Sequence, residues 1–325
     1  MSLGLPRFTF TKGLHDIGHG LFAWLQPDGG WGWSNAGLIV DGDQSLLVDT
    51  LFDVPLTRAM LAAMKSAAPR AAASIDILVN THHNGDHCFG NQCCEGAEII
   101  AHRLAREGML REGPGRLARM MTNAPQMGET GAYLSRIFGA FDFAGVTQTL
   151  PTTVFETELT RTVGDKEVRM IHVGPAHTTG DVLVHVPADK AVFTGDILFI
   201  EGHPIMWEGP VGNWIAACER ILAMDVEVVV PGHGPITDKT GVAAVRDYLL
   251  YVRDQARARF DAGLSALEAA RDIDMRDFDA WTDGERIIVN VATLYRGFGA
   301  PASSEAAGAF EEMAAMAKAR AAWQA

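Results

Sequence analysis

Short apolar runs separated by polar turns dominate the first 240 residues of the chain. Gly37-Leu38-Ile39-Val40 and Ser45-Leu46-Leu47-Val48-Asp49 flank the turn Asp41-Gly42-Asp43-Gln44, a pattern typical of a β-hairpin. An alanine-, methionine- and leucine-rich run at 56–68 predicts a helix that ends before Pro69. Further runs of strand length follow at 75–80, 97–101, 153–155, 159–163, 168–173, 182–186, 191–194 and 226–230.

Helical periodicity replaces this pattern in two long stretches. Residues 103–151 contain the pair Met120-Met121, scattered glycine and proline, and amphipathic pieces such as 133–141, and they predict a mobile helical insertion. An amphipathic helix is predicted at 214–224, and after Thr240 no strong strand pattern remains. The helices predicted there lie at 241–262, 264–271, 281–298 and 303–323.

Two strand-rich halves with helices between and after them predict an α/β fold, a four-layer αββα sandwich. We expect residues 1–240 to form the main domain, with the helical insertion at about 103–151, and residues 241–325 to form a C-terminal helical extension packed on it. A length of 325 residues, 48% of them hydrophobic, is sufficient to bury a large core.

Composition and charge limit the kinds of molecule that the protein is expected to bind. A net charge of −13 argues against nucleic acid, whose binding depends on Lys and Arg. No apolar run approaches the roughly 18 residues of a membrane span, and charged residues interrupt the N-terminal segment, unlike a signal peptide. Four cysteines without paired spacing resemble reduced thiols. We expect a cytoplasmic protein without nucleic-acid or membrane partners that acts on a small molecule; a homo-oligomer is compatible with the sequence.

The segment Thr81-His82-His83-Asn84-Gly85-Asp86-His87 concentrates metal-ligand chemistry at the end of an apolar run. Further candidate ligands follow other apolar runs, at the edge where such sheets bind ligands. Glycine beside several of them lets the backbone turn tightly near an ion. These segments are Leu46-Leu47-Val48-Asp49-Thr50, Gly174-Pro175-Ala176-His177-Thr178-Thr179-Gly180-Asp181, Phe193-Thr194-Gly195-Asp196 and Pro231-Gly232-His233-Gly234.

Together these motifs resemble the metallo-β-lactamase superfamily and its H-x-H-x-D-H signature, with Asn84 in place of the second histidine. The resemblance covers about residues 10–235. It implies a first metal pocket of His82, the Asn84 position and His177, and a second pocket of Asp86, His87 and His233. It further implies that Asp196 bridges the two pockets and that Asp49 supports the ligands from behind. Imidazole and carboxylate ligands suit zinc, with one or two ions bound; iron or manganese are alternatives.

Asn84 weakens only the first pocket, because a neutral amide oxygen is a poor zinc ligand beside imidazole. We expect tight metal binding in the second pocket and weaker or absent metal in the first. His83 could replace the missing ligand, but neighbouring residues on an extended backbone point in opposite directions. A wall position or a supporting hydrogen bond suits His83 better.

Three functions are consistent with this ligand set. The first is a metal-dependent hydrolase, in which a metal-bound hydroxide oriented by Asp86 attacks an ester, lactone, thioester or amide carbonyl. The second is a non-haem iron dioxygenase acting on a persulfide or thiol, since His82, His177 and Asp196 form a two-histidine, one-carboxylate set. The third is a non-catalytic binding protein on a degraded metal site.

Other segments contain residues that are expected to contact the substrate. Trp31 and Trp33 on a glycine-rich turn, with Trp207, could form an apolar contact surface, together with Met120, Met121, Met127 and Phe138 of the insertion. His203 could act as a proton donor or oxyanion stabiliser. Thr282 or Asp283 is a candidate N-cap for the helix carrying Arg286, Asn290 and Arg296, which either pack the tail or anchor a substrate carboxylate.

Overall fold

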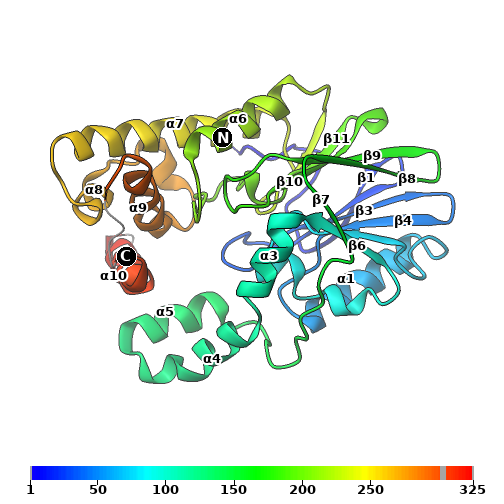
Figure 1. Ribbon diagram of the computed structural model, residues 1–325, viewed down its shortest axis with the longest axis horizontal. Helices are drawn as coiled ribbons and strands as arrows, with labels where there is room; N and C mark the ends of the chain where they lie inside the picture. Colours follow the sequence, from blue (N-terminus) through cyan, green and yellow to red (C-terminus); the bar gives the residue numbers. More distant parts are fainter. Residues whose placement is uncertain (1, 301–304, 324–325) are drawn as a thin grey trace.

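Two β-sheets lie at the centre of the protein, and helices cover their outer faces (Figure 1). The computed structural model describes residues 2–300 and 305–323. The first sheet has the order β1-β2-β3-β4-β5-β6-β7; β1 to β4 are antiparallel, and β4 to β7 are parallel. Its strands are β1 Gly13–Gly18, β2 Leu21–Leu25, β3 Ala36–Asp41, β4 Gln44–Val48, β5 Ile77–Val79, β6 Glu98–His102 and β7 Thr153–Phe155.

The second sheet has the order β12-β11-β10-β9-β8 and is antiparallel except for the parallel pair β11 and β12. Its strands are β8 Glu158–Val163, β9 Lys166–His172, β10 Val182–Val186, β11 Ala191–Phe193 and β12 Val228–Val230. The α-helices are α1 Val54–Ala67, α2 Gly85–Cys88, α3 Arg103–Arg111, α4 Gly115–Asn123, α5 Gly128–Phe138, α6 Val211–Ala223, α7 Lys239–Asp261, α8 Ala266–Asp272, α9 Ile287–Gly297 and α10 Glu305–Trp323.

The layers follow from alternation of side chains along the strands. In β3, Ile39 enters the core between the two sheets, whereas Leu38 packs toward α1 with Met60. In β12, Val228 and Val230 enter the core between the two sheets. Val229 points the other way and packs with residues of α6 and α7. Each sheet therefore buries both faces, which confirms the predicted αββα fold.

The insertion and the C-terminal helices lie on the same side of the molecule (Figure 1). The α10 helix packs between α5 of the insertion and α9. Lys318 of α10 forms an ion pair with Glu129 of α5. Helices from two distant parts of the chain thus meet beside the sheets.

Most element boundaries agree with the sequence prediction, including the hairpin of β3 and β4. The helix predicted at 281–298 begins later, since a 3₁₀ turn at Gly284–Arg286 precedes α9. Neither predicted N-cap starts α9: Asp283 has a φ of 58° and forms an ion pair with Arg286 at 2.9 Å. Among the described residues, no helix is both long and apolar enough to cross a membrane.

Candidate metal centre

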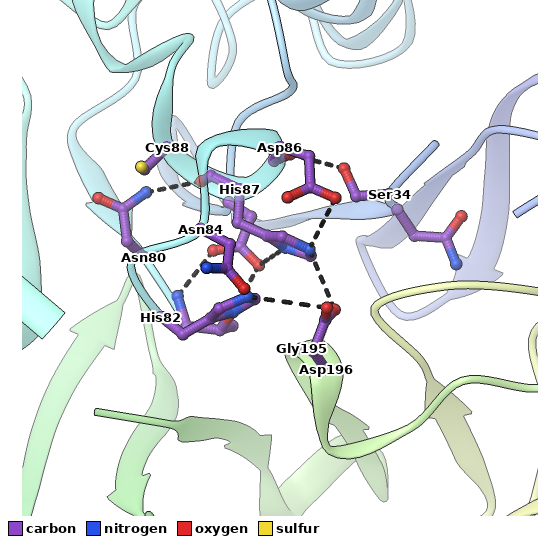
Figure 2. A network of polar contacts seen from close by, with 12 residues as sticks. Ser34, Asn80, His82, Asn84, Asp86, His87, Cys88, Gly195 and Asp196 are labelled. Carbon is purple, nitrogen blue, oxygen red and sulfur yellow. Dashed lines mark hydrogen bonds and ion pairs between the residues drawn. The ribbon is translucent and has the colours of Figure 1, made fainter. Parts of the chain in front are cut away.

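The candidate ligands meet at one edge of the two sheets, because each follows a strand that ends there. His82 follows β5, His177 lies between β9 and β10, Asp196 follows β11 and His233 follows β12. Asp86 and His87 lie in the short helix α2 directly after the β5 loop. The side chains of His82, Asn84, Asp86, His87 and Asp196 converge on one space (Figure 2).

The first ligand group consists of His82, His177 and Asp196, whose ligand atoms lie within 4.8 Å of one another. His177 Nε2 is 3.3 Å and His82 Nε2 is 3.8 Å from Asp196 Oδ2. The Asn84 side chain also belongs here, since its Oδ1 lies 2.8 Å from His177 Nε2. The Asn84 amide therefore faces the first ligand group.

The second ligand group consists of Asp86, His87 and His233, which also fall within 4.8 Å of one another. Asp86 Oδ2 is 3.3 Å from His233 Nε2 and 3.8 Å from His87 Nε2. Asp196 contacts this group as well, with Oδ1 3.0 Å from His87 Nε2 and Oδ2 3.5 Å from His233 Nε2. The Asp196 carboxylate thus lies between the two groups.

Buried hydrogen bonds orient the ligating histidines. Asp49 Oδ2 lies 2.9 Å from His87 Nδ1 and accepts a 2.7 Å hydrogen bond from the Thr81 hydroxyl. The same hydroxyl is 3.0 Å from His82 Nδ1. Asp49 adopts a φ of 63°, an uncommon conformation for a non-glycine residue, and its burial fixes it there. The Asp49 carboxylate therefore supports both groups from behind, as the sequence predicts.

Glycine at position 232 is required by the space that Asp196 occupies. A Cβ on Gly232 would lie 2.1 Å from Asp196 Oδ1, closer than atoms can approach. The backbone after β12 therefore passes directly against the shared carboxylate.

The donor atoms suit a divalent transition-metal ion. His82 Nε2, His87 Nε2 and Asp196 Oδ1 are buried and lack a well-formed hydrogen bond, although the last two form an ion pair at 3.0 Å. Buried polar atoms without partners are rare and costly, and a bound ion satisfies them. Imidazole nitrogens with carboxylate oxygens form a typical zinc ligand set, and the residues present fit this metal.

The pKa values of the histidines shift in opposite directions in the two groups. Burial lowers the pKa of His82 well below its usual value and that of His177 to about 4. Burial also opposes charge on His87 and His233, but the surrounding carboxylates outweigh it. They hold the pKa of His87 well above its usual value and raise that of His233 to about 9. Positive charge is therefore favoured beside Asp86 and Asp196, where a divalent cation fits.

A cavity of about 370 Å³ opens onto both ligand groups. Asn84, Asp86, His177, Asp196 and His233 form its polar end. Trp31, Trp207, Met120 and Phe138 line it, as predicted for the substrate side. His83 also lines it, with Nε2 3.5 Å from Glu112 Oε1 and outside both ligand groups, so it forms part of the wall.

Four of the residues predicted for the site or the substrate side do not line this cavity: His203, Trp33, Met121 and Met127. His203 is fully buried, with Nδ1 3.1 Å from the Tyr248 hydroxyl and Nε2 2.9 Å from the Phe278 carbonyl oxygen. Both contacts hold it among the C-terminal helices, so the predicted catalytic role for His203 is wrong. The Trp33 ring packs 4.7 Å from that of Phe141 and is not part of the cavity lining.

The three polar residues around α9 hold the segment that carries Trp207. Arg286 donates to the His203 carbonyl, Asn290 donates to the Pro204 carbonyl, and Arg296 donates to the Trp207 carbonyl. Packing is therefore their main role, although Arg286 also lines the cavity.

Several lining residues were not predicted from the sequence: Phe52, Phe89, Glu112, Arg116, Leu117, Phe199, Glu208 and Phe310. Phe52 had a usable signal, because it follows the strand exit of Asp49 by three residues. Phe310 had none, since it lies far away in the sequence, on α10.

An αββα sandwich with a histidine–aspartate cluster at one sheet edge defines a class of metal-binding folds. The family model described as the metallo-beta-lactamase superfamily matches residues 29–233, and the chain belongs to this superfamily.

Curated relatives match the same part of the chain. A hydroxyacylglutathione hydrolase of Rhizobium meliloti (strain 1021) is 29% identical over 182 residues, which cover 56% of this chain and 55% of the relative. The 2,4-dinitroanisole O-demethylase subunit alpha of Nocardioides sp. (strain JS1661) is 25% identical over 201 residues, which cover 60% and 51%. The chain thus spans little more than half the length of these relatives.

Solved structures show the same fold. A stereoselective inverting sec-alkylsulfatase from Pseudomonas sp. aligns with a TM-score of 0.67 at 18% identity, covering 89% of this chain and 50% of that one. A metallo-beta-lactamase from Pontibacter korlensis aligns with a TM-score of 0.57 at 17% identity, covering 74% and 99%.

Proposed function

We propose that this protein is a metal-dependent hydrolase that cleaves an ester, lactone, thioester or amide bond of a small molecule. The observation that carries the proposal is the pair of ligand groups that share Asp196 and face one cavity. The named activity of the hydroxyacylglutathione hydrolases supports it, since that activity is thioester hydrolysis.

Zinc is the proposed metal, held most firmly by Asp86, His87, His233 and Asp196. When bound there, the ion supplies a nucleophilic hydroxide at neutral pH and polarises the carbonyl oxygen. Asp86 lines the cavity and is fixed from behind, because its backbone oxygen accepts a 2.6 Å hydrogen bond from the Ser34 hydroxyl. Its carboxylate is placed to orient the attacking water, and the apolar walls exclude other water from the reacting carbonyl.

The domain organisation and location belong to the same proposal. Residues 1–240 form the catalytic domain, and residues 241–325 pack on it and position the Trp207 segment through Arg286, Asn290 and Arg296. The four cysteines, Cys88, Cys93, Cys94 and Cys218, are all free, which supports a reducing, cytoplasmic location.

Metal analysis combined with turnover tests this proposal. The purified protein is expected to contain zinc, to hydrolyse at least one member of an ester, lactone, thioester and amide panel, and to lose turnover on chelation. Zinc is expected to restore it. Iron content with oxygen consumption on a persulfide would instead establish the dioxygenase, and a metal-replete protein without any turnover would establish a binding protein.

A further inference from the structure

Aromatic rings make up much of the apolar lining of the cavity. Six of them form what we call the aromatic wall, and they come from well-separated segments of the chain. Their ring faces and edges, rather than polar groups, meet whatever occupies this part of the cavity. The residues are Trp31, Phe52, Phe89, Phe138, Trp207 and Phe310.

The rings of the aromatic wall contact one another in a continuous series. Phe52 lies between Phe89 and Phe138, with ring centroids 5.8 and 5.7 Å away. Phe138 meets Trp31 edge to face at 5.9 Å, and Trp31 is 6.3 Å from both Trp207 and Phe310. Centroid distances in this range are those of favourable aromatic pairs, and a further ring can join the series in the same way.

The charges around the cavity do not select an anion. Arg116 and Arg286 are the cations among the described lining residues, and Glu112 and Glu208 line it as well. Arg286 is already paired with Asp283 at 2.9 Å and donates to the His203 carbonyl. Arg116 is the other lining cation, and it acts electrostatically on the Glu112 carboxylate. A peptide thioester with several carboxylates would need more available cations than this one.

We propose that the natural substrate class is an uncharged aromatic ester whose ring lies on the aromatic wall while its carbonyl faces Asp86. This inference rests on the proposed hydrolase function and adds its specificity. In the reaction, the oxygen of water bonds to the carbonyl carbon, the bond from that carbon to the alcohol oxygen breaks, and a proton from water ends on the released alcohol. No oxidant or reductant takes part.

Matched esters test the aromatic requirement directly. The esters 2-naphthylmethyl acetate and its decahydronaphthyl analogue share the carbon skeleton and release similar alcohols, but the saturated one is the more hydrophobic. A merely apolar cavity would favour the saturated ester. Aromatic recognition predicts a kcat/KM at least about tenfold higher for the naphthyl ester, because its ring makes contacts with the wall that the saturated ring cannot make. A naphthyl ester carrying a carboxylate is expected to react more slowly than the uncharged one.

Variants locate the effect. Trp207→Leu is expected to raise KM for the naphthyl ester about fivefold or more and to leave the saturated ester nearly unchanged. Trp33→Leu is the matched control, because the Trp33 ring packs on Phe141 outside the cavity. An equal loss for both esters in Trp207→Leu, or the same shift in Trp33→Leu, overturns the assignment.

Binding without turnover separates this inference from the proposed function. Calorimetric titration of the metal-free protein with 2-naphthylmethanol is expected to show tighter binding than with decahydronaphthylmethanol. Equal or weaker binding of the aromatic alcohol overturns the inference, even if the acetates are hydrolysed. Selective binding with no hydrolysis of any ester instead refutes the hydrolase and leaves the aromatic site in place.

Discussion

The two ligand groups share one carboxylate but differ in a single donor. In the second group, Asp86, His87 and His233 offer a charged oxygen and two imidazole nitrogens. In the first, Asn84 places a neutral amide oxygen 2.8 Å from His177 Nε2. The difference between the two groups therefore lies in ligand chemistry, and we expect it to make them bind metal unequally.

The surroundings increase this inequality. Burial disfavours charge on the histidines of the first group and lowers the pKa of both His82 and His177. Around the second group, the carboxylates of Asp86, Asp49 and Asp196 overcome the cost of burial. Asp86 adds a second carboxylate to the second group, and a divalent ion is therefore expected to bind there first.

Replacing the shared carboxylate is expected to have the largest effect. Asp196→Asn removes a charged ligand from both groups, so both are expected to lose metal. Turnover of the best substrate should fall on the order of 100- to 1,000-fold. Elemental analysis after gel filtration measures the metal, and steady-state kinetics measure the turnover. Retention of two ions would show that Asp196 is not shared.

Replacing one histidine of each group in turn tests whether the two groups bind metal with different affinities. His87→Ala is expected to eliminate the tightly held ion, whereas His82→Ala should leave it in place and lose only weakly held metal. Metal content after mild chelation distinguishes these results, and circular dichroism checks that both variants are folded. Equal losses in the two variants would contradict the inequality of the groups.

Restoring the missing imidazole should reduce the inequality. Asn84→His adds a nitrogen ligand beside His177, and its affinity for a second zinc ion is expected to rise about tenfold or more. Asn84→Ala is the matched control and should weaken that site instead. Competition with a zinc-binding dye gives both constants. An unchanged affinity in Asn84→His would mean that the amide is not the cause of the weak site.

The Asp49 carboxylate supports the two groups unequally. Replacing it is therefore expected to lower metal affinity less than replacing a ligand, and to a different degree in each group. It contacts His87 directly, whereas it reaches His82 through the Thr81 hydroxyl. Asp49→Asn is therefore expected to weaken metal binding about 10- to 100-fold at the second group and less at the first. The same dye competition measures both constants, and a greater loss at the first group would reverse the assignment.

The ligands could be predicted from the sequence because strand ends fix them. Each follows an apolar run that enters one sheet edge, and the motif spacing determines which residue faces the metal space. The position of Asn84 beside His177 could be predicted in the same way, and its effect on metal affinity stays a prediction. The αββα layers followed from the same alternation, as Leu38 and Ile39 illustrate.

The cavity walls could not be predicted to the same degree, because tertiary packing decides them. Trp31 and Trp33 are two residues apart on one turn, yet only Trp31 lines the cavity. His203 lies near Trp207 in the sequence but is held by Tyr248. Phe310 reaches the cavity only because α10 packs between α5 and α9. No local sequence pattern predicts the direction in which such side chains point.

A histidine pair outside both ligand groups provides the smallest test. The rings of His102 and His172 stack with centroids 3.6 Å apart and planes 2° from parallel. Their ring nitrogens lie at hydrogen-bond distance from the Glu156 and Thr179 carbonyl oxygens. Among charged groups, the Glu156 carboxylate favours protonation of both rings, and Arg103 opposes that of His102.

Burial lowers the pKa of both His102 and His172 from the usual 6.5. Because these folded-state values lie below those of the unfolded chain, the contribution to stability is complete above about pH 6.5 and is lost as the pH falls through the folded pKa. His172→Phe keeps a stacked ring but cannot be protonated. Below pH 6.5 the variant should therefore lose less unfolding free energy than wild type, by a difference of less than about 1 kcal/mol. Both zinc affinities should stay unchanged. Chemical denaturation at pH 8 gives the cost of the lost Thr179 contact, and repetition at pH 5.5 isolates the titration. A slope equal to that of wild type would show that His172 does not contribute to the acid sensitivity.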